Sequence, residues 1–226
     1  MDEQPVPRDV KKVASRFDAE MRALPVRNAP SVRAVRRRYS RELKAAEPEF
    51  VLDLVRELVA VHGYRGMAYE LILYHRDAFQ RLGEADVEEL GQGIHSWGSV
   101  DSFARLVSGP AWRDGQVSDE LIHRWAESED RWWRRAALVS TVALNVRSQG
   151  GRGDVPRTLG VCRLLVDDPD DMVVKALSWA LRELVVHDPE AVRGFLEEHE
   201  DRLAARVKRE VRNKLTTGLK NPKRKR

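Results

Sequence analysis

The stretch SEDRWWRRAALVSTVAL, residues 128–144, decides the fold because a related stretch, PDDMVVKALSWALREL, follows about forty positions later at residues 169–184. Aligned at that offset, the two stretches agree in character at three positions: Asp130 with Asp170, Arg135 with Lys175, and Ala136 with Ala176. An acidic residue, an apolar pair, a basic residue and a small residue, repeated at a period near 40, are typical of HEAT-type helical pairs. We therefore predict that each stretch is the second helix of such a pair.

The rest of the chain also has helical periodicity. In FVLDLVRELVAV (50–61) the apolar residues share one helical face: Val51, Leu54, Val55, Leu58 and Val59. Short segments rich in Pro, Gly and Asp separate such stretches, and RGMAYELILYH (65–75) resembles a further second helix. We predict an all-α fold, namely a single-domain α-α superhelix (solenoid) of HEAT-like helical repeats over residues 1–219, with a concave face made of the inner helices.

The composition narrows the class of protein. With 42% hydrophobic and 34% charged residues, and no apolar run near the roughly 20 residues that a membrane span requires, the chain is predicted to be soluble and globular. The single cysteine, Cys162, excludes an internal disulfide, and the histidines lack metal-ligand spacing, so we expect no metal and no cofactor. The first residues lack the apolar core of a secretory signal, and we expect a cytoplasmic location.

The formal net charge of +4 conceals two basic segments. Residues 202–226 hold eleven Lys and Arg against one acid, and we predict that the end of this segment, residues 220–226, is a disordered tail. A second basic cluster, at residues 31–44, includes Arg36, Arg37 and Arg38. Basic segments on a mildly acidic body predict that specific surfaces contact a polyanion. Solvated helix faces and a ragged terminus are the alternative, which the charges leave open.

The candidate chemistry lies around the six tryptophans, for any one of which core packing is the default interpretation. SWGSVD (96–101) places Trp97 four residues before Asp101. Either an aromatic surface and a carboxylate are held toward a substrate, or Asp101 or Ser99 caps a helix that begins there. Arg135 and Lys175 also allow two interpretations, a contact with phosphate or a bridge to an acidic residue of a neighbouring repeat.

Three segments together carry a resemblance to a known family. SWGSVDS (96–102), WAESEDRWWRRAAL (125–138) and VVKALSWALREL (173–184) resemble the hallmark segments of the AlkD-like DNA alkylation repair glycosylases, in the same order and at similar separations. The resemblance covers roughly residues 45–215. In the N-terminal fifty residues the family's usual motif is closer to Gly-Ile-x-x-Pro followed by basic residues, whereas the corresponding stretch here, Ser31 to Val35, has no proline.

The resemblance implies a function and a set of site residues. Asp101 would be the catalytic carboxylate, Trp97 and Trp179 would flank the deoxyribose of the lesion, and Arg135 would hold the DNA backbone. We predict further DNA contacts from basic residues of the hallmark segments and of the N-terminal cluster: Arg134, Lys175, Arg182, Arg36, Arg37 and Arg38. The implied reaction is hydrolysis of the N-glycosidic bond of cationic N3- and N7-alkylated purines in double-stranded DNA, by a monomer that associates with the nucleoid when it binds DNA.

Two other functions stay open at this point. A non-catalytic HEAT-like module could bind damaged or branched DNA through the Arg36 to Arg38 cluster and the basic tail, although the presence of Asp101, Trp97 and Trp179 argues against it. A protein-interaction solenoid would have an apolar concave groove and no salt-dependent affinity for DNA. A lyase reaction would need an amine nucleophile, and Lys175, the one lysine in the hallmark segments, is more simply explained as structural.

Overall fold

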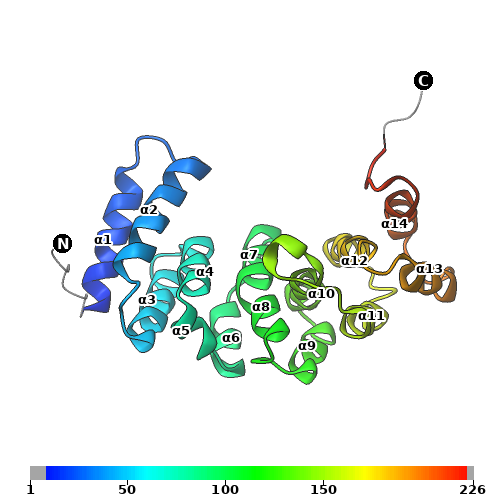
Figure 1. Ribbon diagram of the computed structural model, residues 1–226, viewed down its shortest axis with the longest axis horizontal. Helices are drawn as coiled ribbons and strands as arrows, with labels where there is room; N and C mark the ends of the chain where they lie inside the picture. Colours follow the sequence, from blue (N-terminus) through cyan, green and yellow to red (C-terminus); the bar gives the residue numbers. More distant parts are fainter. Residues whose placement is uncertain (1–8, 223–226) are drawn as a thin grey trace. The chain divides into compact units, whose positions relative to one another are not determined.

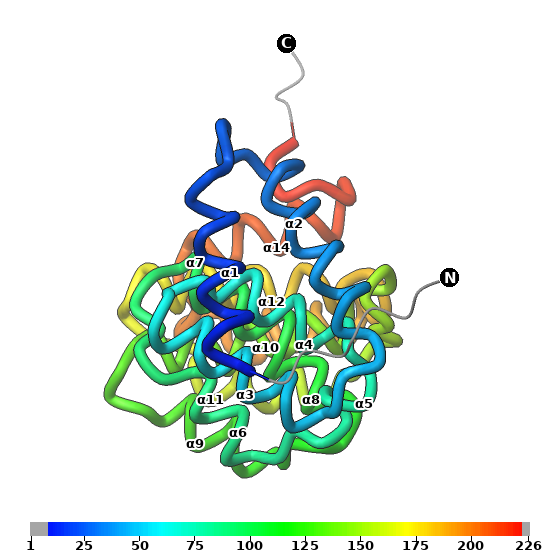
Figure 2. The backbone as a smooth tube through the Cα atoms, turned by 90° about the vertical axis from the view of Figure 1, so that its left-hand side faces the viewer, coloured from blue at the N-terminus to red at the C-terminus, as the bar shows by residue number. Residues whose placement is uncertain are grey.

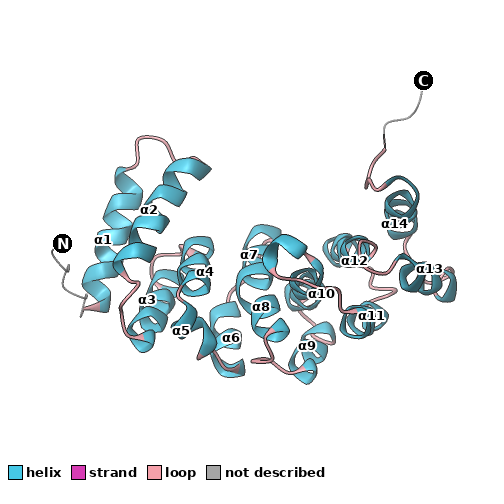
Figure 3. Cartoon of the chain, in the orientation of Figure 1, coloured by secondary structure: helices cyan, strands magenta, loops and turns pink. Residues whose placement is uncertain are grey.

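Helices make up most of residues 9–222, the part of the chain that the computed structural model describes (Figure 1). Within that range there is no strand, as Figure 3 shows, so the predicted all-α helical-repeat fold is confirmed. None of these helices is both long and apolar enough to cross a membrane. The helices group into two compact units, Met1–Gln92 and Gly93–Arg226. The single domain over residues 1–219 stays a prediction, and residues 223–226 of the predicted tail lie outside the described residues.

The first unit shows how the apolar periodicity becomes a core. Its described helices are α1 (Val10–Ala23), α2 (Ala29–Glu42), α3 (Pro48–Ala60), α4 (Arg65–Tyr74), α5 (Arg76–Gln80) and α6 (Glu84–Gly91). The face predicted for residues 50–61 is confirmed, because all five of its apolar side chains are buried on α3. Phe17 of α1 packs edge-on against Tyr39 of α2, with ring centres 4.9 Å apart. Ala68 is fully buried on α4, which packs against α3.

The second unit contains both copies of the repeat. Its described helices are α7 (Trp97–Phe103), α8 (Gly109–Arg113), α9 (Asp119–Ala126), α10 (Arg131–Asn145), α11 (Val155–Leu164), α12 (Asp171–Leu184), α13 (Pro189–Glu198) and α14 (Ala205–Thr217). The helices α10 and α12 pack side by side (Figures 1 and 2), and α12 packs in turn against α14. Since α9 and α11 lie beside α10 and α12 respectively, the two related stretches are the second helices of consecutive helical pairs.

The repeated residues have the same local roles in both copies. Asp130 caps α10 by accepting a hydrogen bond from the Trp132 amide at 2.8 Å, and Asp170 caps α12 through the Met172 amide at the same distance. Each cap satisfies a backbone N–H that the first turn of a helix leaves without an intrahelical partner. The matched small residues, Ala136 and Ala176, are fully buried.

One segment of the second unit departs from α-helical geometry. Residues Ala104–Ser108 form a π-helical turn between α7 and α8. Pro110, which follows this turn, has no backbone N–H and its ring would clash with a carbonyl of the preceding α-helical turn, so the wider π-turn accommodates it. The adjacent Gly109 lies against α10: a Cβ atom there would be 2.6 Å from the Ala104 carbonyl oxygen and 2.7 Å from that of Ser140.

Replacing Gly109 or Gly98 by alanine should change the stability of the protein in opposite directions. Gly109→Ala is expected to lower the free energy of unfolding by about 1–3 kcal/mol, because backbone atoms of α10 must move to admit the methyl group. Gly98→Ala in α7 is expected to raise it by about 0.5–1 kcal/mol, because a Cβ atom there meets nothing within 4 Å and alanine is the better helix former. Urea denaturation measures both, and equal effects of the two changes would contradict the close approach of α8 to α10.

Candidate active site

The start of α7 places Trp97 and Asp101 on one helical face. The cap of this helix is Ser96, whose hydroxyl accepts from the Ser99 amide at 3.3 Å, while the Ser99 hydroxyl accepts from the Ser96 amide at 3.1 Å. The interpretation of Asp101 or Ser99 as the N-cap is therefore wrong, because α7 begins at Trp97 and both residues lie inside it. Asp101 lies one turn further on, four residues after Trp97, so both side chains project from the same side of α7.

Asp101 is held by Arg135 of α10. The Arg135 Nε donates to Asp101 Oδ1 at 2.9 Å and Nη2 donates to Oδ2 at 3.0 Å, which is the two-pronged geometry of a strong guanidinium–carboxylate pair. The side chains of Asp101 and Arg135 are 17% and 7% exposed. The Arg135 Nη1 donates to the Met172 carbonyl of α12. Arg135 thus joins three helices. Of its two interpretations, a bridge to an acidic residue of a neighbouring repeat agrees with these contacts.

Trp179 lies on α12, the helix whose Met172 carbonyl accepts a hydrogen bond from Arg135. Met172 and Trp179 are seven residues apart, which places them on the same side of the helix two turns from each other. The Trp179 indole Nε1 donates to Glu183 Oε1 at 2.9 Å, and its ring centre is 5.8 Å from the guanidinium carbon of Arg105. Because Arg105 follows Asp101 by four residues, this contact brings Trp179 to the segment of chain that carries the carboxylate.

The tryptophans divide into core and surface residues. Trp112 is fully buried and Trp125 nearly so, and Trp125 packs against Trp133 with ring centres 4.7 Å apart, so core packing accounts for them. Trp97 is 64% exposed, more than any other tryptophan of the chain. Exposing a large indole to water forgoes about 1.5–3 kcal/mol of burial. A ligand that covers Trp97 would recover part of that free energy.

The other three basic residues of the second unit that are predicted to contact DNA differ in how strongly their side chains are engaged within the protein. The Arg134 Nε donates to Asp168 Oδ2 at 2.6 Å and its Nη1 to two backbone carbonyls, so its guanidinium ties the start of α10 to the loop before α12. Arg182 donates to Ser178 at 3.2 Å, and burial lowers the pKa of Arg182 while Glu210 opposes that shift. Lys175 pairs with Asp171 on its own helix and is more exposed than Arg134. Their binding of DNA stays a prediction.

The three arginines of the N-terminal basic cluster also differ in burial and in ion pairing. Arg36 is buried, donates to Glu70 Oε2 at 2.8 Å and stacks on the Tyr74 ring at 4.4 Å, so its side chain braces α2 against α4. Arg38 is half exposed and pairs with Glu20. Arg37 is exposed and has no ion pair among residues 9–222, which makes it the member of the three whose charge is most available to a polyanion.

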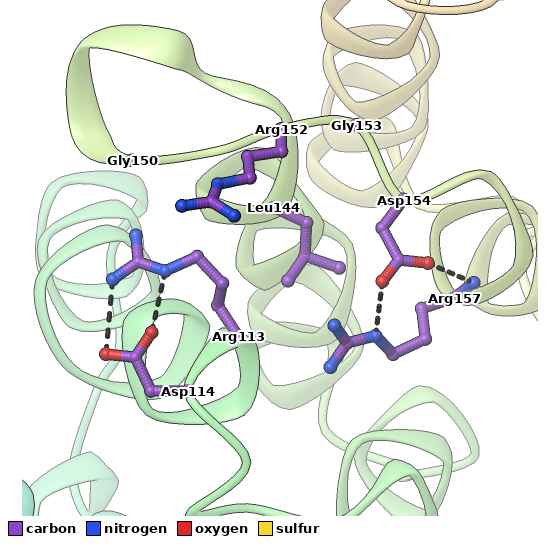
Figure 4. A pocket seen from close by; sticks show the side chains of 8 residues that line it. All are labelled: Arg113, Asp114, Leu144, Gly150, Arg152, Gly153, Asp154 and Arg157. Carbon is purple, nitrogen blue, oxygen red and sulfur yellow. Dashed lines mark hydrogen bonds and ion pairs between the residues drawn. The ribbon is translucent and has the colours of Figure 1, made fainter.

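A hollow of the second unit, about 370 Å³ in volume, lies beyond the carboxyl end of α10, away from the cluster around Asp101 (Figure 4). Its charged lining is largely self-compensated, because Arg113 pairs with Asp114 at 2.8 Å and Arg157 with Asp154 at 2.6 Å. Since α10 rises about 1.5 Å per residue, this hollow is more than two turns away from Arg135 along the helix axis. It therefore does not belong to the cluster around Asp101.

Neither a candidate metal site nor a reactive cysteine is present within residues 9–222, the described part of the chain. Residues 9–222 contain no group of three or more His, Cys, Asp or Glu side chains that could hold a metal ion. Cys162 is fully buried, and burial raises the pKa of its thiol, so the nucleophilic thiolate form is disfavoured. The cluster of Trp97, Asp101, Arg135, Trp179 and Arg105 is the candidate site.

Arg105 is the residue that sequence reasoning missed. The sequence shows that Arg105 follows Asp101 by four residues and Trp97 by eight. It does not show the contact with Trp179, which Arg105 makes from within the π-turn. A π-turn has no dependable sequence signature beyond the Gly109–Pro110 pair that follows it.

Comparison with known families agrees with the resemblance carried by the three hallmark segments. A family model described as DNA alkylation repair enzyme matches residues 5–215, which is nearly the whole of the 226-residue sequence. No curated protein matches the chain significantly. Because the family match extends through both compact units, the prediction from the hallmark segments is confirmed: the chain belongs to the DNA alkylation repair enzyme family.

Proposed function

We propose that this enzyme is a monofunctional DNA glycosylase that hydrolyses the N-glycosidic bond of cationic N3- and N7-alkylated purines in double-stranded DNA. The observation that carries the proposal is the partly exposed Asp101 carboxylate, which lies on the same face of α7 as the exposed indole of Trp97. Two hydrogen bonds from Arg135 of α10 fix this carboxylate. The family match supports a role in alkylation repair.

The leaving group explains why one carboxylate suffices. A purine alkylated at N3 or N7 carries a positive charge, so when the bond to C1′ breaks and both electrons go to the base, the base departs neutral. No general acid has to protonate it. Positive charge instead develops on the sugar, and a fixed carboxylate and electron-rich indole faces stabilise such a cation.

The same carboxylate serves the second half of the reaction. A water oxygen forms the new bond to C1′, and the proton that it loses is accepted by Asp101 and then released to solvent. Each oxygen of Asp101 takes a hydrogen bond from Arg135 and keeps acceptor capacity for that water. In this proposal Arg135 acts as a positioning residue, because all three of its guanidinium nitrogens already donate within the protein and two of these bonds go to Asp101.

Selectivity for charged bases is the expected consequence. Incubation with duplex DNA that holds 7-methylguanine should yield free 7-methylguanine and abasic sites, because that base leaves without protonation. DNA that holds hypoxanthine, which is neutral, should yield base at least about a hundredfold more slowly, since general acid catalysis commonly contributes that factor and is missing here. Equal release of both bases would contradict this mechanism. Binding of the 7-methylguanine duplex with no release would support the non-catalytic DNA-binding module.

A further inference from the structure

We infer that Arg105 is a DNA-binding residue of this site, which contacts a backbone phosphate beside the lesion. The inference deepens the proposed glycosylase function and rests on it for the identity of the nucleic acid. Three observations carry it: the position of Arg105 on the face of Trp97 and Asp101, its lack of a polar partner, and its contact with Trp179.

The position of Arg105 follows from the helix. Trp97, Asp101 and Arg105 are spaced by four residues, so they lie along one side of α7 and the π-turn that continues it. Asp101 is linked to α12 through Arg135, which donates to the Met172 carbonyl. One turn further along, Arg105 contacts α12 directly, through the ring of Trp179. Arg105 is therefore adjacent to Asp101, which the proposed function places against the sugar, and to Trp179, which the resemblance to the glycosylases implies flanks it.

The polar atoms of Arg105 are unusual because they have no partner. Its Nε is buried without a hydrogen bond, and its guanidinium has no ion pair within residues 9–222. Three neighbouring cations are compensated by acids, Arg135 by Asp101, Arg134 by Asp168 and Lys175 by Asp171. A partly buried charge without a counter-charge costs free energy. An anion is thus the ligand that this position lacks.

Charge and shape specify the anion. Asp101 and Arg135 cancel each other. Glu183, which accepts from the Trp179 indole, forms no ion pair with Arg105, so the positive charge of Arg105 stays without a directly bonded counter-charge within residues 9–222. The contact with Trp179 places the guanidinium carbon 5.8 Å from the ring centre and occupies none of the N–H donors with a hydrogen bond. Although Nε is buried, the planar fork of a guanidinium matches two oxygens of a phosphate. A bound phosphate would also cancel the charge of Arg105, which otherwise opposes the developing sugar cation.

The test measures binding apart from catalysis. The probe is a fluorescent duplex with a tetrahydrofuran abasic-site analogue, which has no glycosidic bond to cleave, titrated at several salt concentrations. Arg105→Met is expected to weaken binding about tenfold near 0.1 M salt and to reduce the slope of log K against log salt by about one, as loss of one phosphate contact does. Arg105→Lys, which keeps the charge, should keep the slope.

The matched control is Arg152, which is also without an ion pair within residues 9–222 but is exposed and lies beyond the far end of α10. Arg152→Met should leave affinity and slope unchanged. An unchanged slope in Arg105→Met, or an equal drop in Arg152→Met, would overturn the inference, because Arg105 would then only pack on Trp179. Arg105→Gln replaces the methionine variant if thermal melting shows that the latter is unfolded.

The two proposals fail separately in this design. If the wild-type protein releases no 7-methylguanine while Arg105→Met still shows the reduced slope, the glycosylase function is wrong and the phosphate contact stands. If release is normal and the slope does not change, the function stands and the role of Arg105 is wrong.

Discussion

Asp101→Asn is expected to lower the single-turnover rate of 7-methylguanine release by a factor of about a hundred or more, because it removes the negative charge that faces the developing sugar cation. The amide keeps the size of the side chain and one acceptor oxygen. Affinity for the tetrahydrofuran duplex should change little, since Asp101 is not placed against a phosphate. Quenched-flow release of labelled base, at enzyme in excess over DNA, measures the chemical step by itself.

The contact with Arg135 adds an effect on stability. Because Arg135 donates to both carboxylate oxygens, Asp101→Asn brings an amide NH₂ against one of its N–H groups. We expect the free energy of unfolding to fall by about 1–3 kcal/mol. Asp168→Asn is the matched control, since it weakens the comparable pair with Arg134 without touching the site. Release should stay near the wild-type rate in Asp168→Asn, and an equal loss in both variants would mean that lost folding, not lost charge, stops the reaction.

The fold was predictable because its signals are local. Helical periodicity fixes which side chains of α3 are buried, and the same cap-and-small-residue pattern marks the start of α10 and α12 at Asp130 and Asp170. Neither feature depends on a distant partner. The cap of α7 is harder to predict, since Ser96, Ser99 and Asp101 are all suitable acceptors within six residues and only the position of the first helical residue decides among them.

The partners of the arginines could not be predicted in the same way. Arg134 and Arg135 are adjacent in sequence, but successive residues of a helix point about 100° apart, so one reaches Asp168 and the other Asp101. The sequence pattern shows that both are basic and near a tryptophan, and it carries no information on which helix packs on each side. For the same reason Arg36, which the charge pattern places in a basic cluster, is paired with Glu70 in the interior of its unit.

Arg135→Ala is expected to have the largest effect on stability, lowering the free energy of unfolding by about 3–5 kcal/mol, because it leaves Asp101 partly buried without its counter-charge. In the double variant Asp101→Ala/Arg135→Ala the loss should be smaller than the sum of the single losses, since removing both partners strands no charge. Denaturant unfolding of the four proteins gives the coupling energy. Additive losses would contradict the pairing.

The same variant separates two roles for Arg135. If Arg135 only positions Asp101, Arg135→Ala should slow base release by about a hundredfold, because an unfixed carboxylate no longer faces the sugar, while the salt dependence of DNA binding keeps its slope. If it binds a phosphate, as the resemblance to the glycosylases implies, the slope should fall by about one. The three occupied nitrogens of Arg135 favour the first result. Arg134→Ala, which loses a neighbouring ion pair of similar burial, should destabilise the protein and leave the rate of base release near that of the wild type.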